Sequence, residues 1–136
     1  MEKDKKKANA LIGAYLANGI AGNQKMPGAP LMHFSLVVVP STNNVAGSVE
    51  ITQAIAPPHN SIVIKNVSGV IRSTGFGGVT KVVALEGEYL QAATPPLIGM
   101  YLGKFSAHMA IDDKWNGSGG FTYGNNDVEN VPVKAE

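Results

Sequence analysis

The sequence has no cysteine, few charged residues and few aromatic residues. Without cysteine the chain forms no disulfide and has no thiol for catalysis, which fits a reducing compartment, so a cytoplasmic location is expected. Charged residues make up 15% of the chain and the formal net charge is +1. So weak a field predicts no binding to nucleic acid or to an anionic membrane. No apolar run is long enough to span a bilayer as a helix.

The motifs of common catalytic and metal sites are also missing. The three histidines lack HxH and HExxH spacing. The glycines at 75, 77 and 78 precede a strand pattern, so they indicate a β-turn and not a phosphate-binding loop. Asp112 and Asp113 do not fit the calcium-loop pattern, and adjacent carboxylates on a strand point to opposite faces. These features predict a protein that is not an enzyme and that binds no metal or cofactor.

The longest regular pattern is a pair of strands, Ser61–Ser73 and Val79–Leu90, which are joined by glycines. Both strands are rich in β-branched residues, which favour a pleated and half-buried surface. Ile62 and Ile64 fall on one face of the first strand, whereas Val67 and Ile71 fall on the other. Since a straight strand cannot place both sets in one core, a bulge is predicted near residues 66–69.

Shorter strands are predicted on both sides of this hairpin, with turns between them. Residues 31–39 and 45–53 alternate apolar and polar side chains, and residues 101–111 do so most strictly. The last of these strands is expected to direct Tyr101, Phe105, Met109 and Ile111 into the core. Asn116 and Gly117 predict a hairpin turn, and Pro132 predicts a final strand at a sheet edge. The expected fold is mainly β, either an antiparallel β-sandwich or a small open barrel.

The N-terminal part has a different periodicity. After a charged run, apolar residues recur at helical spacing and predict an amphipathic α-helix within residues 8–21. The predicted organisation is therefore residues 1–27 as a charged end, helix and start of a linker, and residues 28–136 as an antiparallel β domain. The alternative interpretation of the N-terminal segment is a signal peptide, which would export the protein.

Three short segments resemble a small family of uncharacterised bacterial domains. They are the run GSVEITQAIAPP at residues 47–58, the Trp115-Asn116-Gly117 turn with Tyr123 after it, and NVPV at residues 130–133. The resemblance covers residues 29–134 and leaves the predicted helix outside. It implies a bacterial source, and it implies no activity and no functional residues.

The sequence does not determine a function, and two hypotheses from different classes fit it. The first is a non-enzymatic interaction or structural module that self-associates or binds another protein. In that case the contact surface is either the edge strand that Pro132 predicts or the stripe of the N-terminal helix, whose residues are Leu11, Ile12, Tyr15 and Leu16. The alternative is a binding domain for a small apolar ligand or a sugar. Its ligand would contact an aromatic face of Tyr101, Trp115 and Tyr123, or enter a cavity lined by Leu85, Tyr89, Phe105 and Met109.

Overall fold

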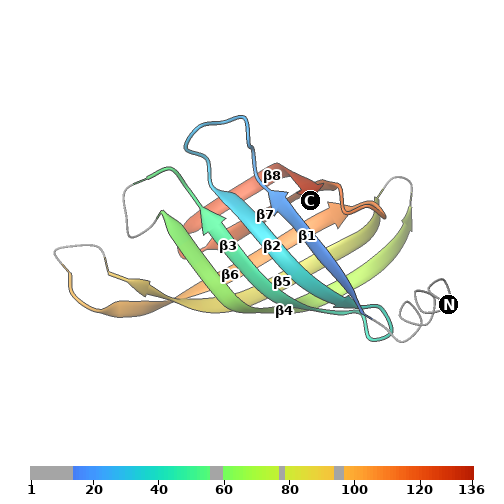
Figure 1. Cartoon of the computed structure of the whole chain (residues 1–136), viewed down its shortest axis with the longest axis horizontal. Helices are drawn as coiled ribbons and strands as arrows, with labels where there is room; N and C mark the ends of the chain where they lie inside the picture. The colour runs from blue at the N-terminus through green and yellow to red at the C-terminus, as the bar shows by residue number, and fades with distance from the viewer. Residues whose placement is uncertain (1–13, 56–59, 77–78, 94–96) are drawn as a thin grey trace.

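The fold is a closed barrel of eight antiparallel strands in a computed structural model (Figure 1). The structure describes residues 14–55, 60–76, 79–93 and 97–136. Each strand pairs with the next one along the chain, and β1 closes the barrel by pairing with β8. The strands are β1 (Tyr15–Ala21), β2 (Leu31–Val39), β3 (Asn44–Thr52), β4 (Ser61–Phe76), β5 (Val79–Ala92), β6 (Met100–Ile111), β7 (Gly117–Tyr123) and β8 (Asn126–Ala135).

Alternation along the strands fills the barrel interior. In β2 the inward side chains are fully or almost fully buried, and the same holds for alternate positions of β3, β5 and β6. The inward residues of these strands include Met32, Phe34, Leu36, Val38, Val45, Val49, Ile51, Val83, Leu85, Phe105, Met109 and Ile111. The predicted strands and their inward faces are therefore confirmed for the body of the barrel.

The predicted bulge in β4 is also present. The register between β3 and β4 shifts so that Lys65 and Asn66 together lie opposite Ser48. This extra residue reverses the alternation of β4, because successive side chains on a strand point to opposite faces. As a result Ile64 before the bulge and Val67 after it are both buried.

Two inward glycines leave space that a neighbouring aromatic ring occupies. A Cβ on Gly19 would lie 2.5 Å from Cζ of Phe34, and a Cβ on Gly103 would lie 2.4 Å from Cζ of Tyr89. The rings therefore pack directly against bare backbone. The residues predicted to line a ligand cavity, such as Phe105 and Met109, belong to this same buried cluster.

The N-terminal helix prediction is wrong for the part of that segment that the structure describes. Residues 15–21 form β1, which pairs with β2 along its whole length and with β8 over Gly19–Ala21. The inward residues of β1 are Ala17, Gly19 and Ala21, whereas Leu16 points outward and is exposed. Because the strand buries its small residues, its larger apolar residues produced a misleading helical pattern. Residues 8–13 of the predicted helix lie outside the described residues.

The predicted mainly β, antiparallel fold is confirmed; of its two forms the sandwich is wrong, and the small open barrel is corrected to a closed one. The sequence pattern indicated a sheet edge at Pro132, yet β8 pairs with β7 on one side and with β1 on the other. Proline lacks an N–H but keeps its carbonyl. That carbonyl accepts a hydrogen bond of 3.0 Å from the Gly22 amide, just past the last paired residues of β1 and β8.

Candidate functional site

Strands β5 and β6 extend beyond the barrel as a two-stranded arm, defined here as residues 89–103 (left side of Figure 1). Within it β5 and β6 pair with each other from Tyr89–Gly103 to Ala92–Met100. The pairing of β4 with β5 ends at Val67–Gly87, and that of β7 with β6 ends at Tyr123–Phe105. No described strand therefore pairs with the outer edge of either arm strand.

The hydrogen-bond pattern shows which backbone groups face the open edge of β6. The Ala93 amide donates to the Gly99 carbonyl at 2.9 Å, so 93 and 99 form a hydrogen-bonded pair. Hydrogen-bonded and non-hydrogen-bonded pairs alternate along an antiparallel ladder, so Met100 and Leu102 belong to non-hydrogen-bonded pairs with β5. Their N–H and C=O groups therefore point away from β5. The Lys104 carbonyl follows the same alternation, since it accepts a bond of 3.0 Å from the Gly124 amide across the sheet.

The arm carries five exposed apolar side chains, here called the arm patch. Leu90, Met100 and Leu102 point outward from the two strands, Leu97 and Ile98 lie between the end of β5 and the start of β6, and all five are 57–99% exposed. Leu90 lies directly opposite Leu102 in the ladder. No charged residue occurs between Glu88 and Lys104. A cluster of exposed apolar side chains of this kind is typical of a binding surface.

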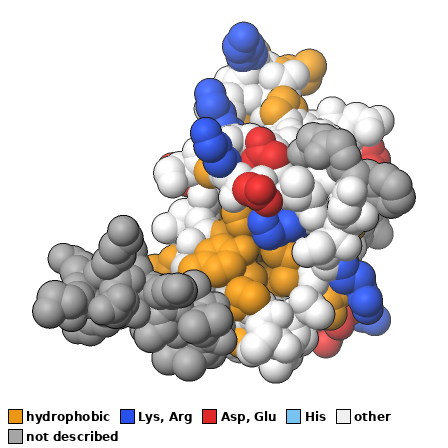
Figure 2. Space-filling view, turned by 90° about the vertical axis from the view of Figure 1, so that its right-hand side faces the viewer, with side chains coloured by type: hydrophobic (Ala, Val, Ile, Leu, Met, Phe, Trp, Pro, Cys, Tyr) orange, Lys and Arg blue, Asp and Glu red, His pale blue; other side chains and the backbone are white. Residues whose placement is uncertain are grey.

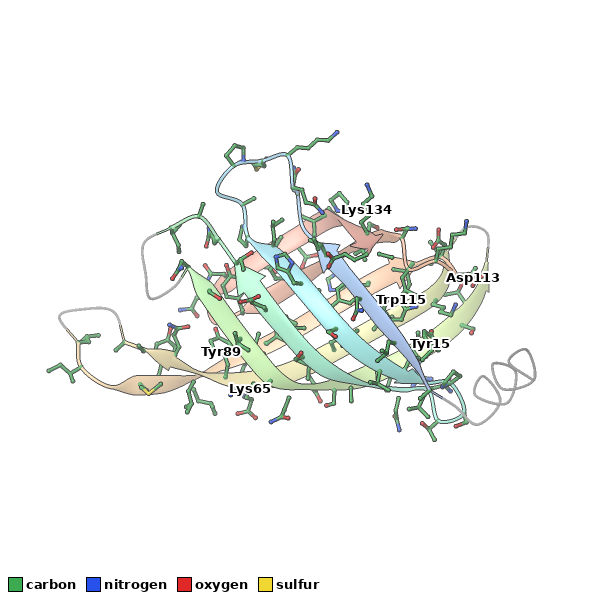
Figure 3. All side chains as sticks on the ribbon, in the orientation of Figure 1. Tyr15, Lys65, Tyr89, Asp113, Trp115 and Lys134 are labelled. Atoms are coloured by element: carbon green, nitrogen blue, oxygen red, sulfur yellow. The ribbon has the colours of Figure 1, made fainter. Side chains whose placement is uncertain are left out.

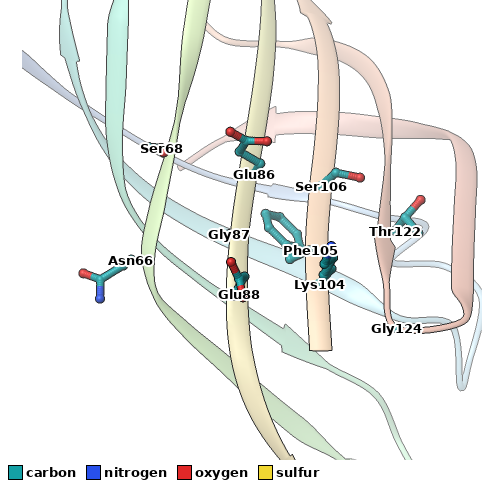
Figure 4. Close-up of a pocket in the computed structure, with 10 residues that line it drawn as sticks. All are labelled: Asn66, Ser68, Glu86, Gly87, Glu88, Lys104, Phe105, Ser106, Thr122 and Gly124. Atoms are coloured by element: carbon teal, nitrogen blue, oxygen red, sulfur yellow. The ribbon is translucent and has the colours of Figure 1, made fainter. Parts of the chain in front are cut away.

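Next to the arm, the outer face of the barrel is polar along the same two strands. A depression of about 700 Å³ lies over β4 to β7, with Glu86, Glu88, Lys104 and Ser106 among its lining residues (Figure 4). Glu88 lies opposite Lys104, and Glu86 opposite Ser106. Two residues further along each strand, the next outward pair is Leu90 and Leu102, and both are apolar. The change occurs where β5 and β6 leave the barrel.

The other end of the barrel is closed by the only tryptophan of the chain, Trp115. It follows β6 in the turn to β7, has a positive φ of 65° and is 5% exposed. Its ring centroid lies 5.8 Å from that of Phe34, and its Nε1 donates to the Tyr15 hydroxyl at 3.4 Å. The Asp112 carboxylate supports the turn by accepting bonds from two backbone amides of the turn. Tyr15 and Trp115 thus lie together at the end of the barrel opposite Tyr89 (Figure 3).

A hollow of about 300 Å³ opens at this same end. The buried side chains Val38 and Ile71 are among its lining residues, and Lys81 and Asp113 also line it. Figure 2 looks onto this end and shows apolar side chains gathered next to charged ones of both signs. Lys81 Nζ lies 3.0 Å from the Asp113 carboxylate, and this hydrogen bond, with a second from Thr80, lowers the pKa of Asp113.

A family comparison covers nearly all of this barrel. The profile of a domain of unknown function, DUF1842, matches residues 12–128, from before β1 into β8. The chain belongs to the DUF1842 family. No curated protein matches the sequence. The predicted resemblance to a family of uncharacterised domains is thereby confirmed, and the family domain begins well before the residues on which the resemblance rested.

The three aromatic residues predicted to bind a ligand do not form one face in this DUF1842 domain. Trp115 lies at one end of β7 and Tyr123 at the other, where it pairs with Phe105. Tyr101 was expected to face the core, but it lies in the arm and is 48% exposed because the barrel ends before it.

Tyrosines at the arm end of the DUF1842 barrel do lie near one another. Burial raises the pKa of Tyr89, with further contributions from Tyr101 and Tyr123, and burial also raises the pKa of Tyr123. Of the three residues predicted to form an aromatic face, Tyr101 and Tyr123 therefore lie near Tyr89, and Trp115 lies at the other end of the barrel.

Two of the four residues predicted for self-association can be located. Tyr15 contacts Trp115 through its hydroxyl, and Leu16 is 73% exposed on the outer face of β1. Leu11 and Ile12 lie outside the described residues. The arm patch was not predicted. Its signal in the sequence is the long uncharged run between Glu88 and Lys104, which the prolines at 95 and 96 made resemble an ordinary loop.

The histidines of the DUF1842 domain that the structure describes occur in separate places. His33 Nε2 lies 3.1 Å from the Thr52 hydroxyl, and His108 Nε2 lies 3.4 Å from the Glu129 carboxylate. Among the described residues no group of three or more His, Asp or Glu side chains is arranged to hold a metal ion. Within the same residues there is no helix of the length and apolarity needed to cross a membrane.

Proposed function

We propose that this DUF1842 barrel is a non-enzymatic interaction module that assembles with a second copy of itself, and that the arm is its contact surface. The observation that carries the proposal is the arm patch, five large apolar side chains on an uncharged ribbon that projects from the barrel. The patch exposes surface that water solvates poorly, so covering it with protein is favourable.

The exposed area of the arm is of the size that a stable contact needs. The five residues of the patch and Tyr101 are 48–99% exposed. With roughly 200 Å² for a fully exposed large side chain, they expose about 800 Å² over both faces of the arm, an upper limit that equals the contribution of one partner to an interface of standard size. The lack of charge on the arm favours a partner whose surface is also uncharged, because a charged surface would lose its hydration in the contact and gain no opposite charge. The arm of a second copy is such an uncharged surface.

The proposal is tested by the dependence of mass on concentration. We expect light scattering to show that the wild-type mass rises toward that of a dimer, and that a Leu90→Lys, Ile98→Lys variant stays monomeric. Both replaced side chains are exposed, so the variant should keep the wild-type melting temperature. Val82→Lys is the matched control, because Val82 lies on the outer face of β5 in the barrel body and is 42% exposed. A wild-type chain that is monomeric at millimolar concentration would refute the proposal.

A second candidate function is binding of a small apolar ligand at the Trp115 end. The hollow of about 300 Å³ favours it, because buried Val38 and Ile71 line it and Lys81 lies at its rim. Since Tyr15 both lines the hollow and bonds Trp115, a ligand there should change the emission of the sole tryptophan. Titration with decanoate tests this function, and an unchanged emission up to millimolar decanoate would count against it.

A further inference from the structure

We infer that two copies of this chain join by pairing the open edges of their β6 strands, antiparallel, with Met100 of each copy opposite Leu102 of the other. The inference rests on the proposed self-association and specifies the groups that make it. A twofold axis then passes beside Tyr101, so that Tyr101 faces Tyr101 of the second copy. The contact is isologous, as in most homodimers.

The backbone groups of Met100 and Leu102 are the ones that would form this contact. At the open edge of β6, Met100 and Leu102 each present an N–H and a C=O, and no described residue bonds them. In the proposed register these two residues exchange hydrogen bonds with the same two residues of the second copy, so that all of these groups gain partners. Edge strands with such unpaired groups add a further strand readily.

The register also joins the two arm patches. Leu90 lies opposite Leu102 within one arm. Across the new contact Leu102 lies opposite Met100 of the second copy, so an apolar row crosses both arms on one face. On the other face the two Tyr101 rings meet as a cross-strand aromatic pair, a favourable neighbour in antiparallel sheets.

The register avoids the barrel of each copy. Lys104 is the next residue with outward groups, and its carbonyl is already bonded to Gly124 in the turn between β7 and β8. With Met100 opposite Leu102, the two copies pair only over residues 100–102, and the partner's β6 then continues past the tip of the arm. The second barrel therefore lies beyond the tip. A pairing shifted toward Lys104 would instead press the partner strand against that turn.

A lipid bilayer is the other surface that an apolar ribbon could contact. The open edges make it a poorer partner, because backbone N–H and C=O groups without hydrogen-bond partners are costly in hydrocarbon. A second strand satisfies these groups, whereas lipid tails cannot. The observations thus favour a second copy.

The first test is a disulfide at the symmetry axis. The natural chain has no cysteine, so Tyr101→Cys introduces one thiol per copy. Directly opposite residues of a non-hydrogen-bonded pair have Cα atoms about 4.5 Å apart, which is within the range that a disulfide spans. Mild oxidation should convert Tyr101→Cys to a covalent dimer on a non-reducing gel. Val82→Cys, exposed on the barrel body, should stay monomeric.

The second test separates backbone pairing from side-chain packing. Leu102→Pro and Leu102→Ala both shorten the side chain, but only proline removes the N–H that faces the open edge. The bonds between β5 and β6 do not use this N–H, so both variants should fold, which thermal unfolding checks. Two hydrogen bonds are lost per dimer in Leu102→Pro. We expect its dissociation constant to exceed that of Leu102→Ala about 30-fold.

The outcomes distinguish this inference from the proposed function. Association of the wild type without cross-linking of Tyr101→Cys, and with equal weakening by Leu102→Pro and Leu102→Ala, would overturn the edge pairing and leave self-association standing. A monomeric wild type would overturn both. Sedimentation of that monomer with phosphatidylcholine vesicles would assign the arm to a lipid surface instead.

Discussion

Replacing Phe105 by alanine should be among the most destabilising single changes in the barrel. Phe105 is 2% exposed, and it lies opposite Gly87 on β5 and Tyr123 on β7. Loss of the buried ring removes about 1.5–3 kcal/mol of transfer free energy. Gly87 has no side chain that could fill the space, so a residual cavity of roughly 60–80 Å³ adds about 1.5–2 kcal/mol. The expected loss in free energy of unfolding is about 3–5 kcal/mol.

Thermal unfolding followed by circular dichroism measures this loss. With an unfolding entropy of about 0.3 kcal/mol per kelvin for a chain of this length, the melting temperature of Phe105→Ala should fall by roughly 10–17 °C. Ser106→Ala is the control, because Ser106 is the next residue, points outward and is exposed. Equal melting temperatures for the two variants would show that the barrel does not bury this face of β6.

Three further outcomes follow from the same structure. Gly103→Ala should destabilise the barrel by about 1–3 kcal/mol, because the new Cβ would lie 2.4 Å from the Tyr89 ring. In a Tyr89→Ala background the same substitution should lower the free energy of unfolding far less. Equal losses in the two backgrounds, measured by denaturant unfolding, would contradict the close contact. Asp113→Asn should lower the melting temperature slightly at pH 7. The pKa of Asp113 is lowered in the folded state, so the stability that its carboxylate contributes is lost as the pH falls below 3.8 and through the folded-state pKa, and the two melting temperatures should then converge. A difference that persists in acid would argue against the Lys81 bond. Burial raises the pKa of Tyr123 above 10.0, so the stability that the protonated hydroxyl contributes is present below pH 10 and is lost as the pH rises through the folded-state pKa. Tyr123→Phe should therefore remove a late-ionising component from the alkaline absorbance titration. An unchanged titration would refute the burial of Tyr123.

The sequence alone determined the strands from β2 onward and most of the faces that they bury. Period-two alternation is a local property, so the inward residues of β2, β3 and β6 could be identified without knowing their neighbours. The bulge in β4 followed from the same rule, because Ile64 and Val67 could share one core only if the alternation reversed between them. Membership of a family of uncharacterised domains was also visible in short motifs.

The tertiary structure decided the remaining features, since each depends on residues far apart in the chain. Closure requires β1 to meet β8, and Gly19 on β1 is readable as an inward position only once Phe34 is seen to occupy its space. Leu16, which suggested a helix, is an outward residue of that strand. The exposure of Tyr101 has the same origin. Its alternation matches that of buried Phe105, but β7 ends opposite Phe105, so beyond that point no described strand covers this side of β6 and Tyr101 stays exposed.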